Sequence, residues 1–444
     1  MKKIILFFFL LGFTIPALSQ QQFEFVDAKS DRVKFPIRLI NNLVFIPVKV
    51  NGVELLFLLD SGVEETILFG FEDPGKLNLN NVKKINIQGL GDSQGVEGLR
   101  SSGNLLTIDK LQSKNHMLYL ILDPSFNLST YVGITVNGII GSAAFNNHLV
   151  EIDYAKRMVS FHKLNSKFHV KIQKEFTRIP LSIERNKPYV KAVVRLNDED
   201  VAVKLLVDNG NSDAIWLFDE ISDKIEVPQK HFKDYLGQGL SGAVEGKRAR
   251  IDRFSIADFQ FKIPIVAFPD SISIKNISMQ SNRLGSVGGE ILKRFTSVFD
   301  YKNGCLYLKK NKNYKNTFYY NKSGIEVWHT GVQLVKQLVV VPDNSFVMHA
   351  EDIKTDKTAG IKVKYKTELK PVYEIGYIRM NSNAEKCGLK IGDIIVSIDG
   401  KEAYNLSLQQ LNALLWSDDE IWIEVKVERE GKLMDFKFKL IDVL

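Results

Sequence analysis

The chain has 444 residues, enough for about three domains of ordinary size. Apolar residues make up 45% of the sequence and charged residues 25%, a balance that excludes disordered and fibrous proteins. The formal net charge is +7, but the basic residues are mixed with acidic ones rather than gathered in a stripe, so we expect no nucleic-acid partner.

The N-terminal residues predict export from the cytoplasm. Two lysines precede an apolar run from Ile4 to Phe13, and small residues precede a cleavage site at Gln20. Residues 1–19 are therefore expected to be a signal peptide, and the mature protein is expected to be periplasmic or secreted. No later segment reaches the roughly 20 apolar residues that a spanning helix needs, so no membrane span is expected.

One short pattern occurs twice in the chain. Leu58-Leu59-Asp60-Ser61-Gly62 and Leu206-Val207-Asp208-Asn209-Gly210 each end an apolar run, and their aspartates are 208 − 60 = 148 residues apart. Val96-Glu97-Gly98 recurs as Val244-Glu245-Gly246 at the same offset. We infer a duplicated lobe, the first copy over residues 20–165 and the second over residues 166–310.

Each aspartate is expected to follow the second strand of a hairpin. The first hairpin is expected to run from Leu43 to Leu59 around an Asn51-Gly52 turn. Both central positions of such a turn need positive φ, which Asn and Gly tolerate. The second hairpin repeats this around Asn197-Asp198. Pro47 has no N–H to donate, so its strand is expected at a sheet edge. The Gly-rich tips that follow are interpreted as ordinary turns or as flaps, with the candidate flap residues Gly89, Gly91, Gly95, Gly98, Gly237, Gly239 and Gly242.

The character of the chain changes after residue 310. Residues 311–322 are rich in Lys and Asn and are interpreted as a solvated linker. Capping-box patterns begin at Ser382 and Ser407, and they predict two short helices between β-rich segments. Residues 323–444 are therefore expected to form a small α+β domain.

The segment from Asn381 to Gly400 resembles the signature of bacterial PDZ domains. Such domains bind extended peptides as an added strand beside a helix. The resemblance implies a peptide partner at a groove whose candidate residues are Ile375, Gly376, Tyr377, Leu408 and Leu411. An internal peptide, an intramolecular contact and purely structural support all remain open as the role of this domain.

The two-lobed part resembles the aspartic peptidases of the pepsin and retropepsin type. Their Asp-Thr/Ser-Gly motif is braced by a hydrophobic-hydrophobic-Gly element, which Gly138-Ile139-Ile140-Gly141 and Ser286-Val287-Gly288 supply here. Together with the PDZ signature, the mature chain resembles secreted bacterial aspartyl proteases with a C-terminal PDZ domain. The resemblance implies a mainly β fold, with two pepsin/retropepsin-like β lobes followed by a small α+β PDZ domain.

The resemblance also implies an aspartic endopeptidase with Asp60 and Asp208 as its catalytic pair. Two adjacent carboxylates cannot both ionise cheaply, so they share a proton and serve as acid and base toward a water between them. Loop support is expected from Ser61, Gly62, Asn209, Gly210, Gly141 and Gly288. The expected substrate is a peptide or protein in the interlobe cleft of a monomer, the PDZ domain recruits substrate or partner, and neither metal nor cofactor is needed.

Two further interpretations compete with this one. Asn209 stands where the peptidase family has a hydroxyl residue, which leaves a catalytically inactive peptide-binding protein using the interlobe cleft and the PDZ groove. Gly91-Asp92-Ser93-Gln94-Gly95 superficially resembles the serine-nucleophile loop of trypsin-like proteases, but no upstream His stands in the setting that those enzymes need. The repeated Asp153-Tyr154 and Asp300-Tyr301 are interpreted as turn or cap residues.

Overall fold

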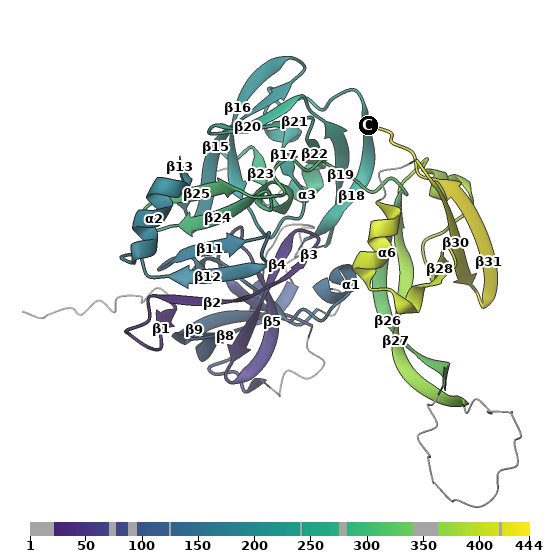
Figure 1. The fold of residues 1–444 in the computed structure, drawn as a ribbon, viewed down its shortest axis with the longest axis horizontal. Helices are drawn as coiled ribbons and strands as arrows, with labels where there is room; N and C mark the ends of the chain where they lie inside the picture. The colour runs from purple at the N-terminus through teal and green to yellow at the C-terminus, as the bar shows by residue number, and fades with distance from the viewer. Residues whose placement is uncertain are drawn as a thin grey trace, which may run out of the picture.

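The computed structural model describes residues 22–70, 77–87, 96–123, 126–239, 242–274, 282–340, 363–416 and 420–444. Over these residues the protein is mainly β, with four sheets and short helices (Figure 1). The predicted signal peptide and Gly89, Gly91 and Gly95 lie outside the described residues. Of the helices that are described, none has the length and apolar character needed to cross a membrane.

The first sheet comes from the N-terminal part of the chain. Its strands are β1 (Glu24–Phe25), β3 (Arg38–Ile40), β4 (Leu43–Val50), β5 (Val53–Leu59), β6 (Thr66–Leu68), β7 (Lys83–Ile87), β8 (Val96–Ile108), β9 (Leu111–Ile121) and β10 (Gly138–Ile140). They follow the order β1-β9-β6-β10-β5-β4-β8-β7, with β3 beside β4. Helix α1 (Leu128–Val132) precedes β10, and the 3-10 helix η2 (Ser142–Ala144) follows it.

The second sheet repeats the centre of the first. Its strands are β14 (Ser182–Glu184), β15 (Lys187–Leu196), β16 (Glu199–Val207), β17 (Ile215–Leu217), β18 (His231–Gly239), β19 (Gly242–Arg250), β20 (Arg253–Ile256), β21 (Phe259–Lys262), β22 (Ile265–Pro269) and β23 (Gly285–Val287), with the short helices η3 (Asp219–Ile221), α3 (Ser271–Ile274) and α4 (Gly289–Leu292). Strand β10 is parallel to β5 and antiparallel to β6, and β23 is likewise parallel to β16 and antiparallel to β17. The two sheets thus share their central topology.

A third sheet joins the two halves. Its order is β13 (Thr177–Pro180), β25 (Cys305–Lys310), β24 (Phe295–Asp300), β11 (Leu149–Asp153), β12 (Met158–His162) and β2 (Arg32–Pro36). In Figure 1 it lies between the other two sheets, with helix α2 (Lys167–Glu175) at its β13 end. Strands β11 and β24 pair antiparallel at its centre, and one continuous apolar core runs through both halves.

The C-terminal module has a sheet and a core of its own. Its elements are β26 (Ile325–Val340), β27 (Val363–Ile378), α5 (Asn383–Lys386), β28 (Ile394–Ile398), β29 (Lys401–Glu402), η5 (Ala403–Asn405), α6 (Leu408–Leu415), β30 (Trp422–Arg429) and β31 (Lys432–Lys439). The sheet order is β26-β27-β28-β30-β31, with β29 beside β28. The predicted capping box at Ser407 is present, and Leu408, Leu411 and Leu415 pack from α6 into the module's core.

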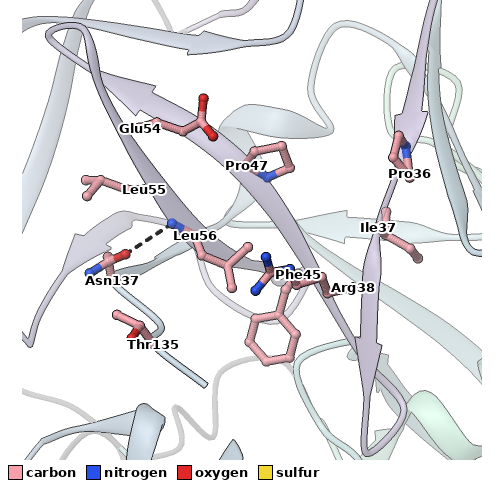
Figure 2. Close-up of a pocket in the computed structure, with 10 residues that line it drawn as sticks. All are labelled: Pro36, Ile37, Arg38, Phe45, Pro47, Glu54, Leu55, Leu56, Thr135 and Asn137. Carbon is pink, nitrogen blue, oxygen red and sulfur yellow. Dashed lines mark hydrogen bonds between the residues drawn. The ribbon is translucent and has the colours of Figure 1, made fainter. Parts of the chain in front are cut away.

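The prediction that Pro47 puts its strand at a sheet edge is wrong, because β4 lies between β5 and β8. The position still suits proline. On this side of β4, strand β3 pairs with Leu43–Phe45 and β8 pairs with Lys49–Val50. Pro47 lies between these two paired segments, so neither strand needs a hydrogen bond from its backbone nitrogen. Pro47 also lines a pocket of about 500 Å³ whose walls come mainly from β3, β4 and β5 (Figure 2).

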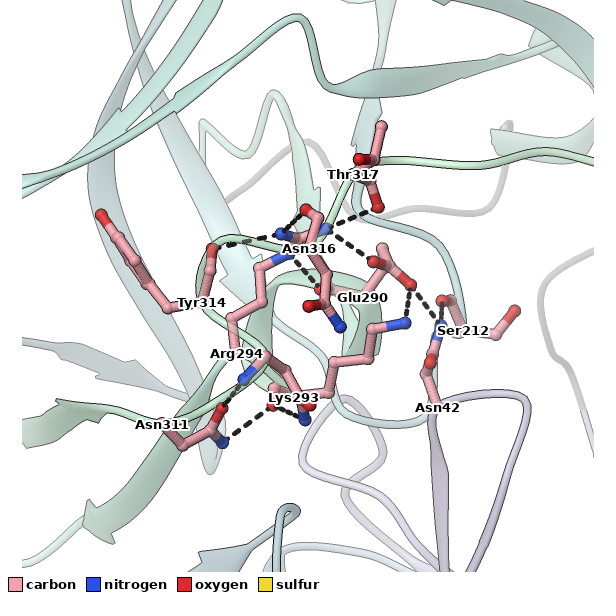
Figure 3. A network of polar contacts seen from close by, with 10 residues as sticks. Asn42, Ser212, Glu290, Lys293, Arg294, Asn311, Tyr314, Asn316 and Thr317 are labelled. Atoms are coloured by element: carbon pink, nitrogen blue, oxygen red, sulfur yellow. Dashed lines mark hydrogen bonds and ion pairs between the residues drawn. The ribbon is translucent and has the colours of Figure 1, made fainter. Parts of the chain in front are cut away.

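The connection to the C-terminal module is more structured than a solvated linker. Arg294 is almost completely buried and donates to the backbone carbonyls of Tyr314 and Asn316 (Figure 3). Its guanidinium also lies 3.8 Å from the ring centroid of Phe318. Phe318 and Tyr320 are buried in the apolar core, so these two aromatic residues of the predicted linker are not solvated.

Candidate functional site

Asp60 and Asp208 each follow the central strand of their own sheet. Strand β5 ends directly before Asp60, and β16 ends directly before Asp208. The parallel neighbours then brace the two loops, because the N–H of Asp60 donates to Ile140 O and the N–H of Asp208 donates to Val287 O, both at 2.9 Å. The two hydrophobic-hydrophobic-Gly elements therefore hold the start of each Asp loop.

Gly141 and Gly288 end these braces at positions with no room for a side chain. A Cβ atom on Gly141 would lie 2.3 Å from the carbonyl oxygen of Val63, and one on Gly288 would lie 2.4 Å from that of Asp213. Backbone oxygens cannot move away as a flexible side chain can. Glycine is therefore required by close backbone approach at both positions.

The glycine of each loop lies against the aspartate of the other loop. A Cβ atom on Gly62 would be 2.7 Å from Asp208 Oδ1, and one on Gly210 would be 2.1 Å from Asp60 Oδ2. Each glycine also donates its own N–H to the carboxyl of its own loop, at 2.7 Å for Asp60 and 3.1 Å for Asp208. The two carboxyl groups are thereby brought together at the junction of the two halves.

Ser61 and Asn209 fasten the two loops to each other. Asn209 Oδ1 accepts from the Ser61 N–H at 2.6 Å, and Asn209 Nδ2 donates to Leu59 O at 2.7 Å. Ser61 Oγ accepts from the Asn209 N–H at 3.1 Å and donates to Val207 O at 2.7 Å. An amide, like a hydroxyl, can both donate and accept, so Asn209 makes the same pair of bonds as Ser61 makes.

Burial raises the pKa of both carboxyl groups. Asp60 is only 7% exposed, and burial, followed by the charge of Asp208, raises its pKa from 3.8 to about 8. Burial also raises the pKa of Asp208, against the opposing charge of Arg283. The hydrogen bond between the two side chains favours the proton on Asp60 and the charge on Asp208. Because two adjacent buried carboxyls cannot both ionise cheaply, a pair of this kind shares one proton.

Two basic side chains near the pair carry no sequence signal. Lys187, at the start of β15, lowers the pKa of both carboxyls by its positive charge. Arg283 lowers the pKa of Asp208 and is fixed by a 2.8 Å hydrogen bond from Nε to Gly285 O. Both come from the second half of the chain at positions outside the repeated motifs, so only the folded structure brings them near Asp208.

Tyr301 lies behind the first Asp loop. Its hydroxyl donates to Ser61 O at 3.4 Å, and its ring stacks on Phe145 at 5.2 Å. The neighbouring Asp300 accepts a hydrogen bond from the Asn303 N–H, as a turn residue does. The turn interpretation therefore describes Asp300, whereas Tyr301 supports the loop that carries Asp60.

Of the candidate flap residues, the structure describes Gly98, Gly237, Gly239 and Gly242. Gly98 lies in β8 opposite Ile121, and the other three lie at the end of the β18–β19 hairpin. This hairpin contacts the C-terminal module, because the Tyr235 ring lies 5.8 Å from that of Tyr377 and 6.3 Å from that of Trp328. The second Gly-rich hairpin is thus held at its side by the module.

A chain of charges connects the C-terminal module with the loop after Asp208. Arg248 is paired with Asp213 at 2.8 Å and with Asp234 at 2.7 Å. Arg379, at the end of β27, lies 3.6 Å from the other oxygen of Asp234. Asp213 follows Asp208 by five residues, so the ion pairs run from the module through the hairpin to the second Asp loop.

The predicted groove residues of the C-terminal module are only partly placed at a groove. Leu408 and Leu411 lie on α6, but Ile375, Gly376 and Tyr377 lie in β27, which is enclosed between β26 and β28. An added peptide strand needs a free edge, so the groove prediction is corrected from β27 to β26, the outer strand of the described sheet.

The comparisons with known proteins concern the C-terminal part and a short stretch of the chain. Residues 374–429 match the PDZ domain family, so the chain carries a PDZ domain. Eighty residues are 34% identical to a protein named "Serine protease Do-like HtrA" from Lactobacillus helveticus. This match covers 18% of the chain and 19% of the relative, so the chain spans about a fifth of the length of the curated relative it matches.

This comparison corrects the predicted function. The sequence resemblance implied an aspartic endopeptidase, whereas the relative that the comparison finds is a serine protease. The aspartic-endopeptidase prediction, together with its inactive peptide-binding variant, is therefore not retained as the function of the chain. The supported part of the earlier resemblance is the C-terminal PDZ domain, together with a likeness over 80 residues to a protein named as a protease.

A hydroxyl–imidazole cluster in the first half does not supply a serine-type site. His116 is bonded through Nδ1 to Ser113 Oγ and through Nε2 to Thr66 Oγ1, both at 2.8 Å. All three side chains are buried, and burial lowers the pKa of His116 to about 3. These hydroxyls are out of reach of a substrate, and the cluster is a structural one. The Gly91–Gly95 segment lies outside the described residues.

Proposed function

We propose that this chain is a PDZ-bearing, protease-like hydrolase, and that Asp60 and Asp208 form its functional site. The observation that carries the proposal is the crossed packing of the two loops. Each carboxyl lies against the glycine of the opposite loop, and the pair holds one proton. The PDZ domain of this chain and its likeness to a protein named as a protease support a protease-like hydrolase.

A half-protonated carboxyl pair suits hydrolysis because it offers an acid and a base at one place. Asp60 holds the proton and can donate it, while the charged Asp208 can accept one. The backbone N–H groups of Gly62 and Gly210 fix the orientation of the two carboxyls. Ser61 and Asn209 keep the loops in register, and we assign them a positioning role.

We also propose that residues 20–165 and 166–310 are two pepsin/retropepsin-like lobes. Support comes from the repeated pairing of β5, β6 and β10 in β16, β17 and β23. The PDZ domain, over residues 323–444, is proposed to bind a peptide. Export by residues 1–19 to the periplasm or the exterior remains part of the same proposal, on the sequence pattern alone.

Hydrolysis of a fluorescently quenched, denatured protein by the full mature chain tests the proposal. We expect Asp60→Asn and Asp208→Asn each to lower the rate at least 100-fold, because each removes one half of the acid–base pair. Asp198→Asn, a change in a hairpin turn, is the matched control and is expected to keep the rate.

Ser93→Ala separates this proposal from serine chemistry. Loss of hydrolysis in both Asp variants with full activity in Ser93→Ala supports the carboxyl pair. Activity that survives both Asp variants and disappears in Ser93→Ala overturns the pair as the reactive centre. A chain that hydrolyses no polypeptide substrate overturns the proposed function itself.

A further inference from the structure

The ligand face of the PDZ domain is occupied by another part of the same chain. A peptide that joins a PDZ domain lies between the edge strand and the neighbouring helix. Here these elements are β26 and α6, and helix α1 of the first half packs on β26 close to the start of α6 (Figure 1). The groove that a peptide would use is therefore covered.

The end of α1 makes side-chain contacts with both walls of this groove. On the helix side, Gln409 Nε2 donates to the carbonyl oxygen of Val132 at 2.5 Å. On the strand side, the ring of Tyr131 meets that of Trp328 edge to face at 5.3 Å. The side chain of Val132 is buried in the apolar core of the first half, so only its backbone carbonyl meets the PDZ domain.

Gly133 shows how closely the two parts fit. It ends α1 in the left-handed conformation, with φ 72°, and its N–H donates to Ser129 O. A Cβ atom on Gly133 would lie 2.6 Å from Leu408 Cβ, so the absence of a side chain is required by the PDZ helix as well as by the turn. The face receives a turn inside the chain, without any terminal carboxylate.

We infer that this PDZ face recognises an internal turn in which an aromatic residue stands two positions before a glycine. Tyr131–Gly133 is its in-chain occupant, and a partner polypeptide presenting such a turn must displace it. Gln409 donates a hydrogen bond to the carbonyl oxygen of the residue before the glycine, and Trp328 packs against the aromatic ring. The inference concerns the PDZ domain and is independent of the chemistry proposed for the carboxyl pair.

Displacement would also change what holds the β18–β19 hairpin. Tyr131 OH donates to Gln238 Oε1 at 3.1 Å, at the end of that hairpin. A partner that takes the place of α1 therefore removes one of the contacts that fix the hairpin, while the Tyr235 contacts to the PDZ domain stay.

Fluorescence anisotropy with the full mature chain tests this inference. The probe is a fluorescein-labelled peptide with the sequence of residues 126–136, amidated at its C-terminus so that no carboxylate is present. In Gly133→Ala the added methyl group and the left-handed strain expel α1 from the groove, and we expect the peptide to bind at least tenfold more tightly than to the unaltered chain. Gly52→Ala is the control, because Gly52 has φ 90° and no neighbour within 4 Å.

A second variant that frees the groove keeps the test valid if Gly133→Ala fails to fold. Tyr131→Ala removes the aromatic contact without straining the backbone, and it should also tighten peptide binding. Adding Gln409→Ala to either opened variant should weaken binding at least threefold, because the peptide carbonyl loses its donor. Equal affinity for the unaltered and opened chains, or no binding to either opened variant, overturns the inference. So does tighter binding of the same peptide with a free C-terminal carboxylate.

Discussion

Replacing Asp60 by asparagine removes the proton that the carboxyl pair shares and leaves its shape almost unchanged. In the folded chain the pKa of Asp60 rises from 3.8 to about 8 because the group is buried beside Asp208. Between these two pH values the folded chain keeps a proton that the unfolded chain has lost. Stability therefore falls as the pH rises through this window.

The size of the effect follows from the same two pKa values. Each tenfold change in proton affinity corresponds to about 1.4 kcal/mol, so the rise from 3.8 to about 8 costs up to roughly 5 kcal/mol at pH 8. At pH 4 the carboxyl is neutral in the folded chain and the cost falls below about 1 kcal/mol. Asp60→Asn should therefore match the unaltered chain at pH 4 and exceed its stability by several kcal/mol at pH 8.

Urea denaturation followed by tryptophan fluorescence measures this difference at pH 4, 6 and 8. Groups outside the pair that titrate in the same range, such as Glu326, are present in both proteins and cancel in the comparison. A free-energy difference that stays constant from pH 4 to pH 8 would refute the shared proton. A fall in the stability of the variant at pH 8 relative to the unaltered chain would do so as well.

Three further changes test the surroundings of the pair by thermal or urea unfolding. Asn209→Ala leaves a buried N–H and a buried carbonyl of the facing loop without their partner and should cost about 3 kcal/mol, whereas Asn209→Ser should recover part of that loss. Gly210→Ala places a methyl group against Asp60 and should lower the free energy of unfolding by more than about 2 kcal/mol. Gly331→Ala is the control: Gly331 has no neighbour within 4 Å, so the change should be less than about 0.5 kcal/mol. Arg294→Met leaves the carbonyls of the connection to the PDZ domain without a donor and should cost about 3 to 5 kcal/mol; an unchanged midpoint would mean that this connection is not held by the guanidinium.

Local signals in the sequence predicted the hairpins and the helix ends. The Asn51-Gly52 and Asn197-Asp198 turns have the positive φ values that these residues favour. The capping box at Ser407 begins α6 where the pattern indicates. Such signals depend on the bonding of a few neighbouring residues, so they can be identified without any knowledge of the rest of the fold.

The contacts between distant parts of the chain could not be predicted in this way. Lys187 and Arg283 carry no motif, and only the folding of the second sheet brings them near Asp208. The outer position of β26 and the docking of α1 on it depend on how the PDZ domain packs against the lobes. The serine protease relative likewise corrected a function that had been inferred from the motifs alone.

The pairing at the centre of the third sheet has a consequence for the ancestry of the chain. Glu151 lies opposite Val298, its own counterpart in the repeat at an offset of 298 − 151 = 147, and Val150 and Ile152 lie opposite Phe299 and Ser297 on either side. An approximate dyad axis therefore passes through this pair of residues. Strand β11 pairs antiparallel with its own repeat counterpart, so this edge is self-complementary. A protein of half the length could therefore form the same sheet by pairing with a second copy of itself. Gene fusion of such a homodimer would produce the pairing seen here and free the two copies to diverge, as Ser61 and Asn209 have done.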